Sequence, residues 1–325
     1  LYTDASEDVD EFMWNNPDFL IIFGAGNQGF PDADNFGTIG SPGTAKNSMS
    51  VGMTYYGQYA GVLGDVSSWG PTSDGRIKPE VVFPGQSVRS ADGDGDVTTD
   101  NCATAGGSGT SYASPGVVGN ALLVREYFME GWYPTGSPTP ADAFTPSAAL
   151  IKAMLVNSAV SISVTQSNEP ITIPHAAQGW GRVLLDNALY FAGDSRGLWL
   201  DEYTGGFTAP SDPPVIYQLE MEDTGEPLEI TLAWTDYPST PAASIHLVND
   251  LDLRVDGPSG DFVGNNFLYG SSLTGGTHDR VNNLENVLIP DPAPGVYSIR
   301  ISPHAIPSGP QDFVLVVTGG RFTVT

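Results

Sequence analysis

The pattern of apolar residues changes near residue 195, and this change constrains the possible folds more than any other feature of the sequence. Before it, short apolar runs typical of strands alternate with longer segments that suit helices, an order that predicts an α/β arrangement with a parallel sheet. After it, short alternating runs are separated by Gly, Pro, Asn and Asp, without a convincing helical pattern. The sequence therefore predicts an α/β part over residues 1–195 and an all-β sandwich or jelly roll over residues 196–325.

In the first part, residues 6–15 are expected to form a helix with Ser6 as its N-cap. The continuous apolar run 19–23 predicts a strand that is buried on both faces in the centre of a parallel sheet. Further strands are expected near residues 48–53 and 80–83.

A glycine-rich segment over residues 105–109 leads into an expected helix at about 111–129. Two more helices are expected, from Thr145 or Ser147 to about residue 159 and near residues 185–191. The strands expected in the second part cover residues 215–219, 228–234, 251–255, 296–301 and 313–317.

The composition is strongly acidic, with 38 Asp and Glu residues against 12 Lys and Arg residues. Phosphates would be repelled, so nucleic-acid binding is not expected. Such a surface suits salty or calcium-rich surroundings, because it is well solvated and attracts hard cations. No run of 18 apolar residues occurs, so no membrane span is expected.

Cys102 is the only cysteine, which excludes a disulfide within this chain. It is expected to be either a buried free thiol or the partner of a cysteine on another segment. The sequence begins at Leu1 without an initiator Met or a signal peptide, so we expect it to be the later portion of a longer protein.

The segment Gly-Thr-Ser-Tyr-Ala-Ser-Pro over residues 109–115 places Ser111 at the expected start of a helix. There the hydroxyl is exposed and the backbone N–H groups are free to stabilise a negatively charged oxygen. The alternative is a simple N-cap, since Ser and Thr are common at that position.

Asn27 follows directly on the apolar run that predicts a strand. The carboxyl ends of strands in α/β sheets are where ligands bind, and an Asn amide there can donate to an oxyanion. The alternative is an ordinary turn residue, because Asn and Gly are frequent in turns.

Together, segments 20–29, 41–47, 67–81 and 109–115 resemble, in order and spacing, the motifs of subtilisin-like serine proteases (subtilases, peptidase S8 family). The resemblance implies that Ser111 is the nucleophile and Asn27 the oxyanion-hole donor. It further implies that substrate is bound by Ala25, Gly26, Gly109 and Thr110.

The resemblance extends to the second part through residues 178–183, 247–253 and 283–287, which are similar to oxidation-resistant alkaline subtilases with a C-terminal β-barrel. It implies a partial subtilisin-like parallel-sheet sandwich followed by a jelly-roll-like barrel, and a secreted, extracellular protein. Tyr112 stands where many subtilases have Met, and Tyr forms no sulfoxide. We therefore expect activity to tolerate peroxide.

Subtilases order their catalytic triad Asp, His and Ser along the chain, yet all four histidines here follow Ser111. The resemblance implies that the Asp and His lie on a missing or separate N-terminal fragment of the same protease. Without its base a serine hydroxyl is a weak nucleophile, so this chain alone is expected to be inactive towards peptide or protein substrates. The alternatives are a non-catalytic extracellular scaffold or adhesion module with the same fold, and a lectin-like binder.

Oxygen-bearing side chains in the second part predict a structural calcium site, with Asp250, Asp252, Asp279 and Glu285 as candidate ligands. Asp250 and Asp252 alternate along a strand and therefore share a face. The alternative is that these residues form turns at strand ends. Residues 92–97 begin like an EF-hand loop but lack its downstream Glu, and are expected to form an acidic turn.

Overall fold

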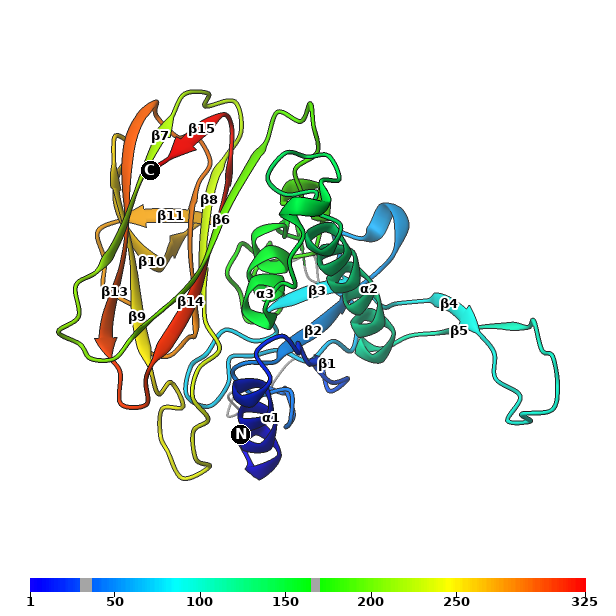
Figure 1. Ribbon diagram of the computed structural model, residues 1–325. Coiled ribbons are helices and arrows are strands. Elements are labelled where there is room, and N and C mark those ends of the chain that lie inside the picture. Colours follow the sequence, from blue (N-terminus) through cyan, green and yellow to red (C-terminus); the bar gives the residue numbers. More distant parts are fainter. Residues whose placement is uncertain (30–36, 165–169) are drawn as a thin grey trace.

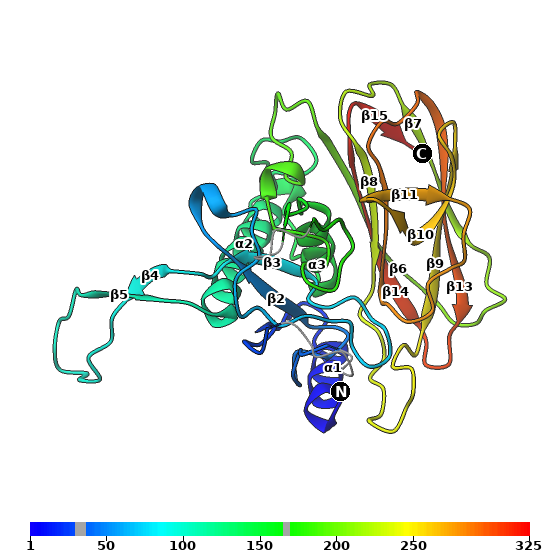
Figure 2. The same ribbon diagram turned by 180° about the vertical axis from the view of Figure 1, so that it is seen from behind.

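The computed structural model describes residues 1–29, 37–164 and 170–325. It contains a part with helices around a small parallel sheet, beside a part made of two antiparallel sheets (Figure 1). The view from behind shows the same two parts in contact along one side (Figure 2). None of the helices in the described ranges is both long and apolar enough to cross a bilayer.

The sheet of the first part has three parallel strands in the order β1-β2-β3. Their bounds are Ile22–Gly24 for β1, Met49–Thr54 for β2 and Val81–Pro84 for β3. Every residue of β2 is buried because this strand has a neighbour on both sides. The strands expected near residues 48–53 and 80–83 are confirmed.

The prediction of a central, doubly buried strand over residues 19–23 is wrong. β1 begins at Ile22, lies at the edge of the sheet and is only half-buried, and the Phe19 side chain is 55% exposed. In the described ranges no strand pairs with the outer edge of β1. The apolar run is long enough for a central strand, but its second neighbour is not among these residues.

Helix α1 (Asp4–Asn15) packs beside the sheet and ends at Asn16, as expected. Its N-cap is Thr3, whereas the predicted cap, Ser6, is fully buried in the first turn. The Ser6 hydroxyl lies 3.0 Å from that of Thr44, so the side chain is used for a tertiary contact instead of a cap.

The other two α-helices are confirmed as α2 (Thr110–Met129) and α3 (Ala148–Asn157). Ser147 caps α3, with its hydroxyl accepting a hydrogen bond from the Leu150 N–H at 3.0 Å. The helix expected near residues 185–191 is reduced to a short turn. The 3₁₀ helices are η1 (Gly57–Tyr59), η2 (Pro140–Asp142) and η3 (Leu185–Asn187).

All strands expected in the second part are confirmed, and they belong to two sheets. The six-stranded sheet runs in the order β11-β10-β9-β13-β7-β15, with bounds β7 Val215–Met221, β9 Asp250–Gly257, β10 Gly260–Leu268, β11 Ser271–Thr274, β13 Gly295–Ala305 and β15 Phe322–Val324. The four-stranded sheet runs β12-β8-β14-β6, with bounds β6 Gly197–Phe207, β8 Leu228–Ala233, β12 Leu284–Ile289 and β14 Gln311–Gly319.

The two sheets face each other across an apolar core, to which both contribute. The end strands β11 and β15 each pair on one side only, so the described residues form a sandwich and no closed barrel. The expected barrel is thus not found, whereas the all-β character of this part is confirmed. The boundary near residue 195 stays a prediction.

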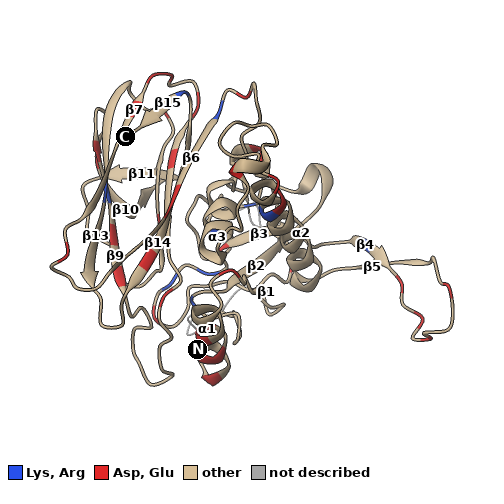
Figure 3. Cartoon of the chain, viewed as in Figure 1, with Lys and Arg blue, Asp and Glu red and all other residues tan. Residues whose placement is uncertain are grey.

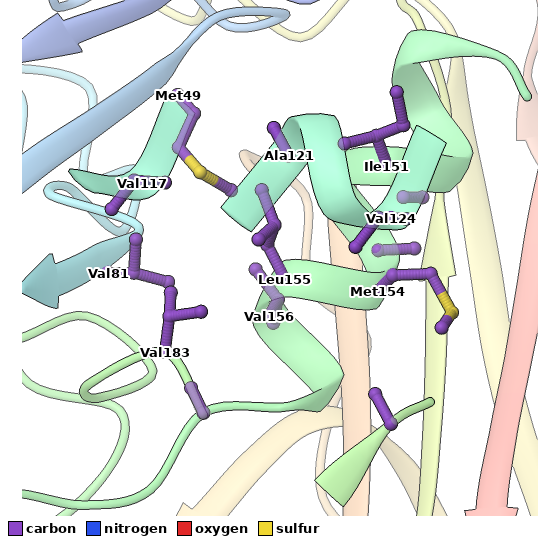
Figure 4. Close-up of a cluster of buried hydrophobic side chains, with 14 of the residues drawn as sticks. Met49, Val81, Val117, Ala121, Val124, Ile151, Met154, Leu155, Val156 and Val183 are labelled. Atoms are coloured by element: carbon purple, nitrogen blue, oxygen red, sulfur yellow. The ribbon is translucent and has the colours of Figure 1, made fainter. Parts of the chain in front are cut away.

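Helix α3 joins the two parts of the molecule, because it packs against α2 on one side and against β8 and β14 on the other. All of its residues are buried. Figure 4 shows Ile151, Met154 and Leu155 of this helix meeting side chains from the parallel sheet and α2. The same apolar cluster reaches Ala233 and Val316 of the four-stranded sheet. A single core therefore spans the two parts.

A hairpin of β4 (Val88–Ala91) and β5 (Thr104–Gly107) projects away from the body as an arm (Figures 1 and 2). Its loop is the expected acidic turn, in which Asp94 accepts a hydrogen bond from the Asp96 N–H at 2.9 Å. Cys102 lies on this loop and is exposed, so the expectation of a buried thiol is wrong. The sequence did not predict the hairpin, because its short strands carry few apolar residues.

Figure 3 marks the Lys and Arg residues of this acidic chain in blue and its Asp and Glu residues in red. The only lysines of the chain, Lys46, Lys78 and Lys152, are all buried. Lys78 and Lys152 both contact the Glu80 carboxylate, at 2.6 and 3.1 Å, while Lys46 pairs with Asp236 just beyond β8. These ion pairs lie where the first part meets the second.

A third buried carboxylate at this junction, that of Glu229 on β8, makes stability depend on pH. Burial raises its pKa to about 7, although hydrogen bonding from Asn286 and the charge of Arg196 lower it. The folded state therefore holds a proton between about pH 4.5 and 7 that the unfolded state releases, and this contribution to stability is lost as the pH rises through 7.

Substituting Glu229→Gln is expected to raise the free energy of unfolding at pH 8 by up to about 3 kcal/mol, with little change at pH 4. Gln is neutral at both pH values and can still accept the Asn286 hydrogen bond of 2.9 Å. Urea unfolding at the two pH values measures the effect. An unchanged pH dependence in the variant would show that Glu229 is not the group responsible.

Candidate active site

Ser111 lies in the first turn of α2, behind a glycine that no other residue replaces easily. Gly109 is the N-cap and has a φ of 151°, a backbone conformation that residues other than glycine rarely adopt. Ser111 is exposed. Pro115, one turn later, has no N–H and so cannot donate to the Ser111 carbonyl as a regular helix would require. The local sequence thus places an accessible hydroxyl at a helix N-terminus.

Asn27 lies against this helix start and is also exposed. Its Oδ1 accepts a hydrogen bond from the Thr110 N–H at 2.9 Å, and the Gly26 N–H donates to the Thr110 hydroxyl at 3.1 Å. With Oδ1 used in this way, the Asn27 Nδ2 donor remains for another acceptor. The loop after β1 is therefore fastened to the start of α2 through Thr110.

The space beside Gly109 brings the two candidate catalytic side chains together. A β-carbon on Gly109 would lie 3.3 Å from Asn27 Nδ2 and 3.3 Å from Ser111 Oγ. The two groups thus flank one small volume that only glycine leaves open. A carbonyl carbon next to Ser111 Oγ would have its oxygen near a hydrogen-bond donor.

The serine pair Ser67 and Ser68, between β2 and β3, supports the Asn27 loop. The Ser68 N–H donates to the Gly26 carbonyl at 3.0 Å, and the Ser68 hydroxyl accepts from the Gln28 N–H at 3.1 Å. Ser67 turns to β2, where its hydroxyl accepts from the Met53 N–H at 3.0 Å. This segment thus holds the loop that carries Asn27.

Ser111 opens into a cleft of about 920 Å³ between the end of β3, the base of the arm and α2. Tyr112 lines the same cleft, and its ring packs on Gly107 at the base of the arm. Of the predicted substrate-binding residues, Gly109 and Thr110 adjoin Ser111 in the chain. None of the four, Ala25, Gly26, Gly109 and Thr110, lines this cleft, and Ala25 and Thr110 are buried. Among the described residues that form the cleft there is no His, Asp or Glu.

None of the four histidines of the chain lines this cleft, and His304 lies on β13 in the second part. His246 is buried, with its ring stacked on Tyr2 at 4.2 Å between centroids, and His175 packs edge-on to Trp69. His278 lies 3.3 Å from Asp252, far along the sequence in the second part. The described residues therefore place no general base beside Ser111.

Three apolar side chains are exposed on α2, the helix whose first turn contains Ser111. Val118, Leu122 and Leu123 are 39%, 60% and 53% exposed. Their positions along α2 put them on its outer side, away from the core residues Val117 and Val124.

The structure places the four candidate calcium ligands near one another but gives most of them other partners. The Arg280 guanidinium contacts the Asp252 carboxylate and lies 3.3 Å from that of Asp250. Asp279 accepts hydrogen bonds from the Asn282 side chain and from the Val281 N–H. Within the described ranges, no three acidic or histidine side chains are arranged to hold a metal ion.

Glu285 is the exception among these carboxylates. It is fully buried, and its Oε2 accepts from the Leu253 N–H at 2.6 Å, but its Oε1 has no hydrogen-bond partner among the described residues. Burial, together with the charges of Asp279, Asp252 and Asp250, raises its pKa well above the usual value. A cation next to this oxygen would stabilise the ionised carboxylate, which burial otherwise disfavours.

The comparisons with known proteins agree with the serine-bearing part of the fold. The model of the Subtilase family, Peptidase_S8, matches residues 2–181, which is more than half of the chain. The chain therefore belongs to the subtilase family of serine proteases.

Two similar relatives come from Dictyostelium discoideum. The serine protease/ABC transporter B family protein tagB is 30% identical over 338 residues, which cover 86% of this chain and 18% of the relative. The related protein tagD is 26% identical over 443 residues, covering 98% of this chain and 24% of the relative. The chain thus spans less than a quarter of the length of these relatives.

A solved structure, the complex of the Aeromonas sobria serine protease with the chaperone ORF2, aligns over 97% of this chain and 67% of that chain. Its TM-score is 0.35 and its sequence identity 13%, a likeness too low to inform the fold.

The sequence predicted that Ser111 and Asn27 lie together, but it did not predict the residues that position them. Ser111 and Asn27 come together as predicted by their motifs. The role of Thr110 as the link between the Asn27 loop and α2 had no local signal, because its partners Gly26 and Asn27 are more than 80 residues away. The base of the arm was also missed as a wall of the cleft.

Proposed function

We propose that this chain is the nucleophile-bearing portion of a serine endopeptidase. The observation that carries the proposal is the arrangement at the start of α2, where Ser111 Oγ and Asn27 Nδ2 flank the same volume beside Gly109. In a subtilase, this pair is what acyl transfer requires of the serine half of the site.

In the proposed reaction, Ser111 Oγ attacks the carbonyl carbon of a peptide bond while a base takes its proton. The carbonyl oxygen becomes an oxyanion, which Asn27 Nδ2 and the free N–H groups at the start of α2 stabilise. The amine leaves with a proton returned by the same base, and an acyl-enzyme forms on Ser111. Water then releases the acid and regenerates the hydroxyl.

The base and its orienting carboxylate are proposed to come from an N-terminal fragment of the same protease, which carries the catalytic His and Asp. Two features support this: the cleft holds no His or Asp among its described residues, and no strand pairs with the outer edge of β1 in the described ranges. A parallel strand added at this edge would satisfy the unpaired backbone groups of β1. The substrates would be peptides or proteins, and the acidic composition supports an extracellular location.

The experiment that tests the proposal is labelling of the native protein, including any N-terminal fragment that purifies with it, with a fluorophosphonate probe. Label mapped to Ser111 in the presence of such a fragment would establish an assembled protease. An unlabelled protein at neutral and alkaline pH, with calcium present and no inhibitor bound, would contradict it and favour a non-catalytic scaffold with the same fold.

We also propose that Tyr112 makes the activity tolerant of oxidation, as in the oxidation-resistant subtilases that the sequence resembles. Treatment with dilute hydrogen peroxide is expected to leave probe labelling of the wild-type protein unchanged, because Tyr forms no sulfoxide. The matched control is Tyr112→Met, in which labelling is expected to fall as the sulfoxide forms. Equal loss in both proteins would contradict this role for Tyr112.

Calcium is proposed to bind the second part through Asp250, Asp252, Asp279 and Glu285. The unpaired Glu285 Oε1 supports a cation there, and Arg280 would have to swing away from Asp252 to admit it. At a calcium concentration about 100-fold above the dissociation constant, the melting temperature is expected to rise by about 5 °C.

Two variants test this calcium site. Glu285→Gln is expected to abolish the calcium-induced rise in melting temperature, because it removes a charged ligand. Arg280→Met is expected to increase calcium affinity, because it removes a competing internal cation. The measurement is the melting temperature of both variants with calcium and with a chelator. A wild-type protein whose melting temperature does not rise with calcium would contradict the proposed site.

A further inference from the structure

A second cavity lies where α1, the start of α3 and the strands β6 and β14 meet, near the lower end of the junction in Figure 1. It has a volume of about 420 Å³, the size of a typical small-ligand site. It shares no residue with the Ser111 cleft. It is therefore a separate feature of the molecule.

Aromatic side chains form much of the wall of this cavity. Tyr203 and Phe313 stack on each other with ring centroids 4.7 Å apart, and Trp14 and Trp234 complete the set. Trp14 and Tyr203 are only half-buried, so their rings remain accessible from the cavity. Aromatic ring faces carry negative charge density and attract cations, above all those that are weakly hydrated.

The charged groups of the cavity are all acidic. Its carboxylates are those of Asp18, Glu202 and Asp312, and none of its described lining residues is Lys, Arg or His. None of the three carboxylates has an ion-pair partner within the described part of the chain. This contrasts with the buried carboxylates of Glu80 and Asp236, which the lysines neutralise.

Glu202 is held in a fixed orientation at this cavity, because its Oε1 accepts a hydrogen bond from the Ser147 N–H at 3.0 Å at the start of α3. Asp312 projects from β14, where burial raises its pKa and the Gly206 N–H partly offsets the rise. Glu202 is half-buried, whereas Asp18 and Asp312 are exposed, and a cation bound here would be attracted by the combined negative charge of all three.

We propose that this cavity binds an arginine side chain of a polypeptide. A guanidinium group is planar, stacks on aromatic rings and donates two parallel hydrogen bonds to a carboxylate, which matches the chemistry of the wall. A lysine ammonium is more strongly hydrated and gains less from the aromatic rings. The volume leaves room for the backbone next to the arginine. The inference does not depend on the proposed protease activity.

The probe for this site is N-acetyl-arginine amide, titrated into the chain while tryptophan fluorescence and heat are recorded. Trp14 and Trp234 line the cavity, so their fluorescence is expected to change on binding. A dissociation constant on the order of 1 mM is expected for a ligand of this size. N-acetyl-citrulline amide, which has the same shape without the charge, is expected to bind at least tenfold more weakly.

Glu202→Gln is expected to weaken binding of the arginine probe at least tenfold, while Gln can still accept the Ser147 hydrogen bond. The matched control is Glu220→Gln, an exposed carboxylate on β7 in the other sheet, which is expected to leave binding unchanged. Asp312→Asn, at an exposed position that is not expected to disturb folding, is a second test, and it is also expected to weaken binding of the arginine probe. Equal affinity for arginine and citrulline, or equal effects of Glu202→Gln and Glu220→Gln, would overturn the proposal.

Discussion

Substituting Ser111→Ala in the assembled protease is expected to abolish fluorophosphonate labelling and to lower kcat for peptide hydrolysis by about 10⁶, the loss found in subtilisin itself when its catalytic serine is removed. The methyl group of Ala cannot form the acyl-enzyme. Because Ser111 is exposed and in the first turn of α2, its loss is expected to leave the fold intact. The measurement is hydrolysis of a peptide substrate by protein that includes the N-terminal fragment.

Asn27 offers a graded test of the same site. Asn27→Asp retains an acceptor for the Thr110 N–H but replaces the Nδ2 donor by a negatively charged oxygen. Asn27→Ala removes both functions. Each is expected to lower kcat by at least about 10² to 10³, the loss known for subtilisin's oxyanion-hole Asn, with little effect on KM.

The contrast between the two variants separates chemistry from folding. If the donor matters, Asn27→Asp lowers kcat while the melting temperature stays close to that of the wild type. Full activity of Asn27→Asp would contradict the oxyanion role. Probe labelling that persists in Ser111→Ala would contradict the role of Ser111 as the nucleophile.

The second large effect is expected on stability, from Glu80→Gln. The Glu80 carboxylate contacts the ammonium groups of Lys78 and Lys152 at 2.6 and 3.1 Å and accepts the Ser50 N–H at 2.7 Å. Its neutralisation leaves two buried ammonium groups without their shared counter-ion. A loss of about 3–5 kcal/mol in the free energy of unfolding is expected, the usual cost of breaking a buried ion pair. Urea unfolding measures it.

The pKa shifts at this cluster agree with that expectation. Burial alone would raise the pKa of Glu80, but the charges of Lys78 and Lys152 outweigh it and lower the pKa below its usual value. The folded pKa is thus depressed, so the contribution of Glu80 to stability is present above the unfolded value of 4.5 and is lost as the pH falls below it. Glu80→Gln is therefore expected to unfold with a weaker dependence on acid pH than the wild type.

Compensating changes provide the control for Glu80. Glu80→Gln combined with Lys78→Met and Lys152→Met removes the whole set of charges, and is expected to recover part of the lost stability, since apolar replacement of buried ion pairs is often neutral or stabilising. Glu220→Gln, at an exposed site on β7, is expected to change stability by less than about 0.5 kcal/mol. A loss below about 1 kcal/mol for Glu80→Gln would contradict the expectation, because it would show that the two lysines do not depend on Glu80 as their counter-ion.

The elements that local sequence specifies were predicted closely. The start of α2 at Thr110 follows a glycine-rich stretch, the N-cap of α3 at Ser147 precedes a continuous apolar helix, and β2 is a short apolar strand. Each depends on neighbours within a few residues, through capping, backbone freedom and hydrophobic period. The same local patterns predicted Ser111 at a helix start and Asn27 in the loop after a strand.

Long-range contacts decided the rest. β1 is an edge strand although its composition suits a central one, since position in a sheet depends on which other strands are present. Asp250 and Asp252 share a face as their spacing predicts, but Arg280 lies against them, and no local pattern encodes that pairing. Lysine is usually exposed to solvent. All three lysines here are nevertheless buried, because Glu80 and Asp236 form ion pairs with them at the junction.

The sequence alone therefore determined the class of most elements and the local positions of Ser111 and Asn27, because those features depend on neighbours along the chain, whereas it missed the β4–β5 hairpin. Only the tertiary structure decided how Thr110 positions Asn27, why the junction tolerates three buried lysines, and that an acidic aromatic cavity forms between α1, α3 and β14. In each case the partners are distant in sequence, and their free energy of interaction exists only once the core has brought them together.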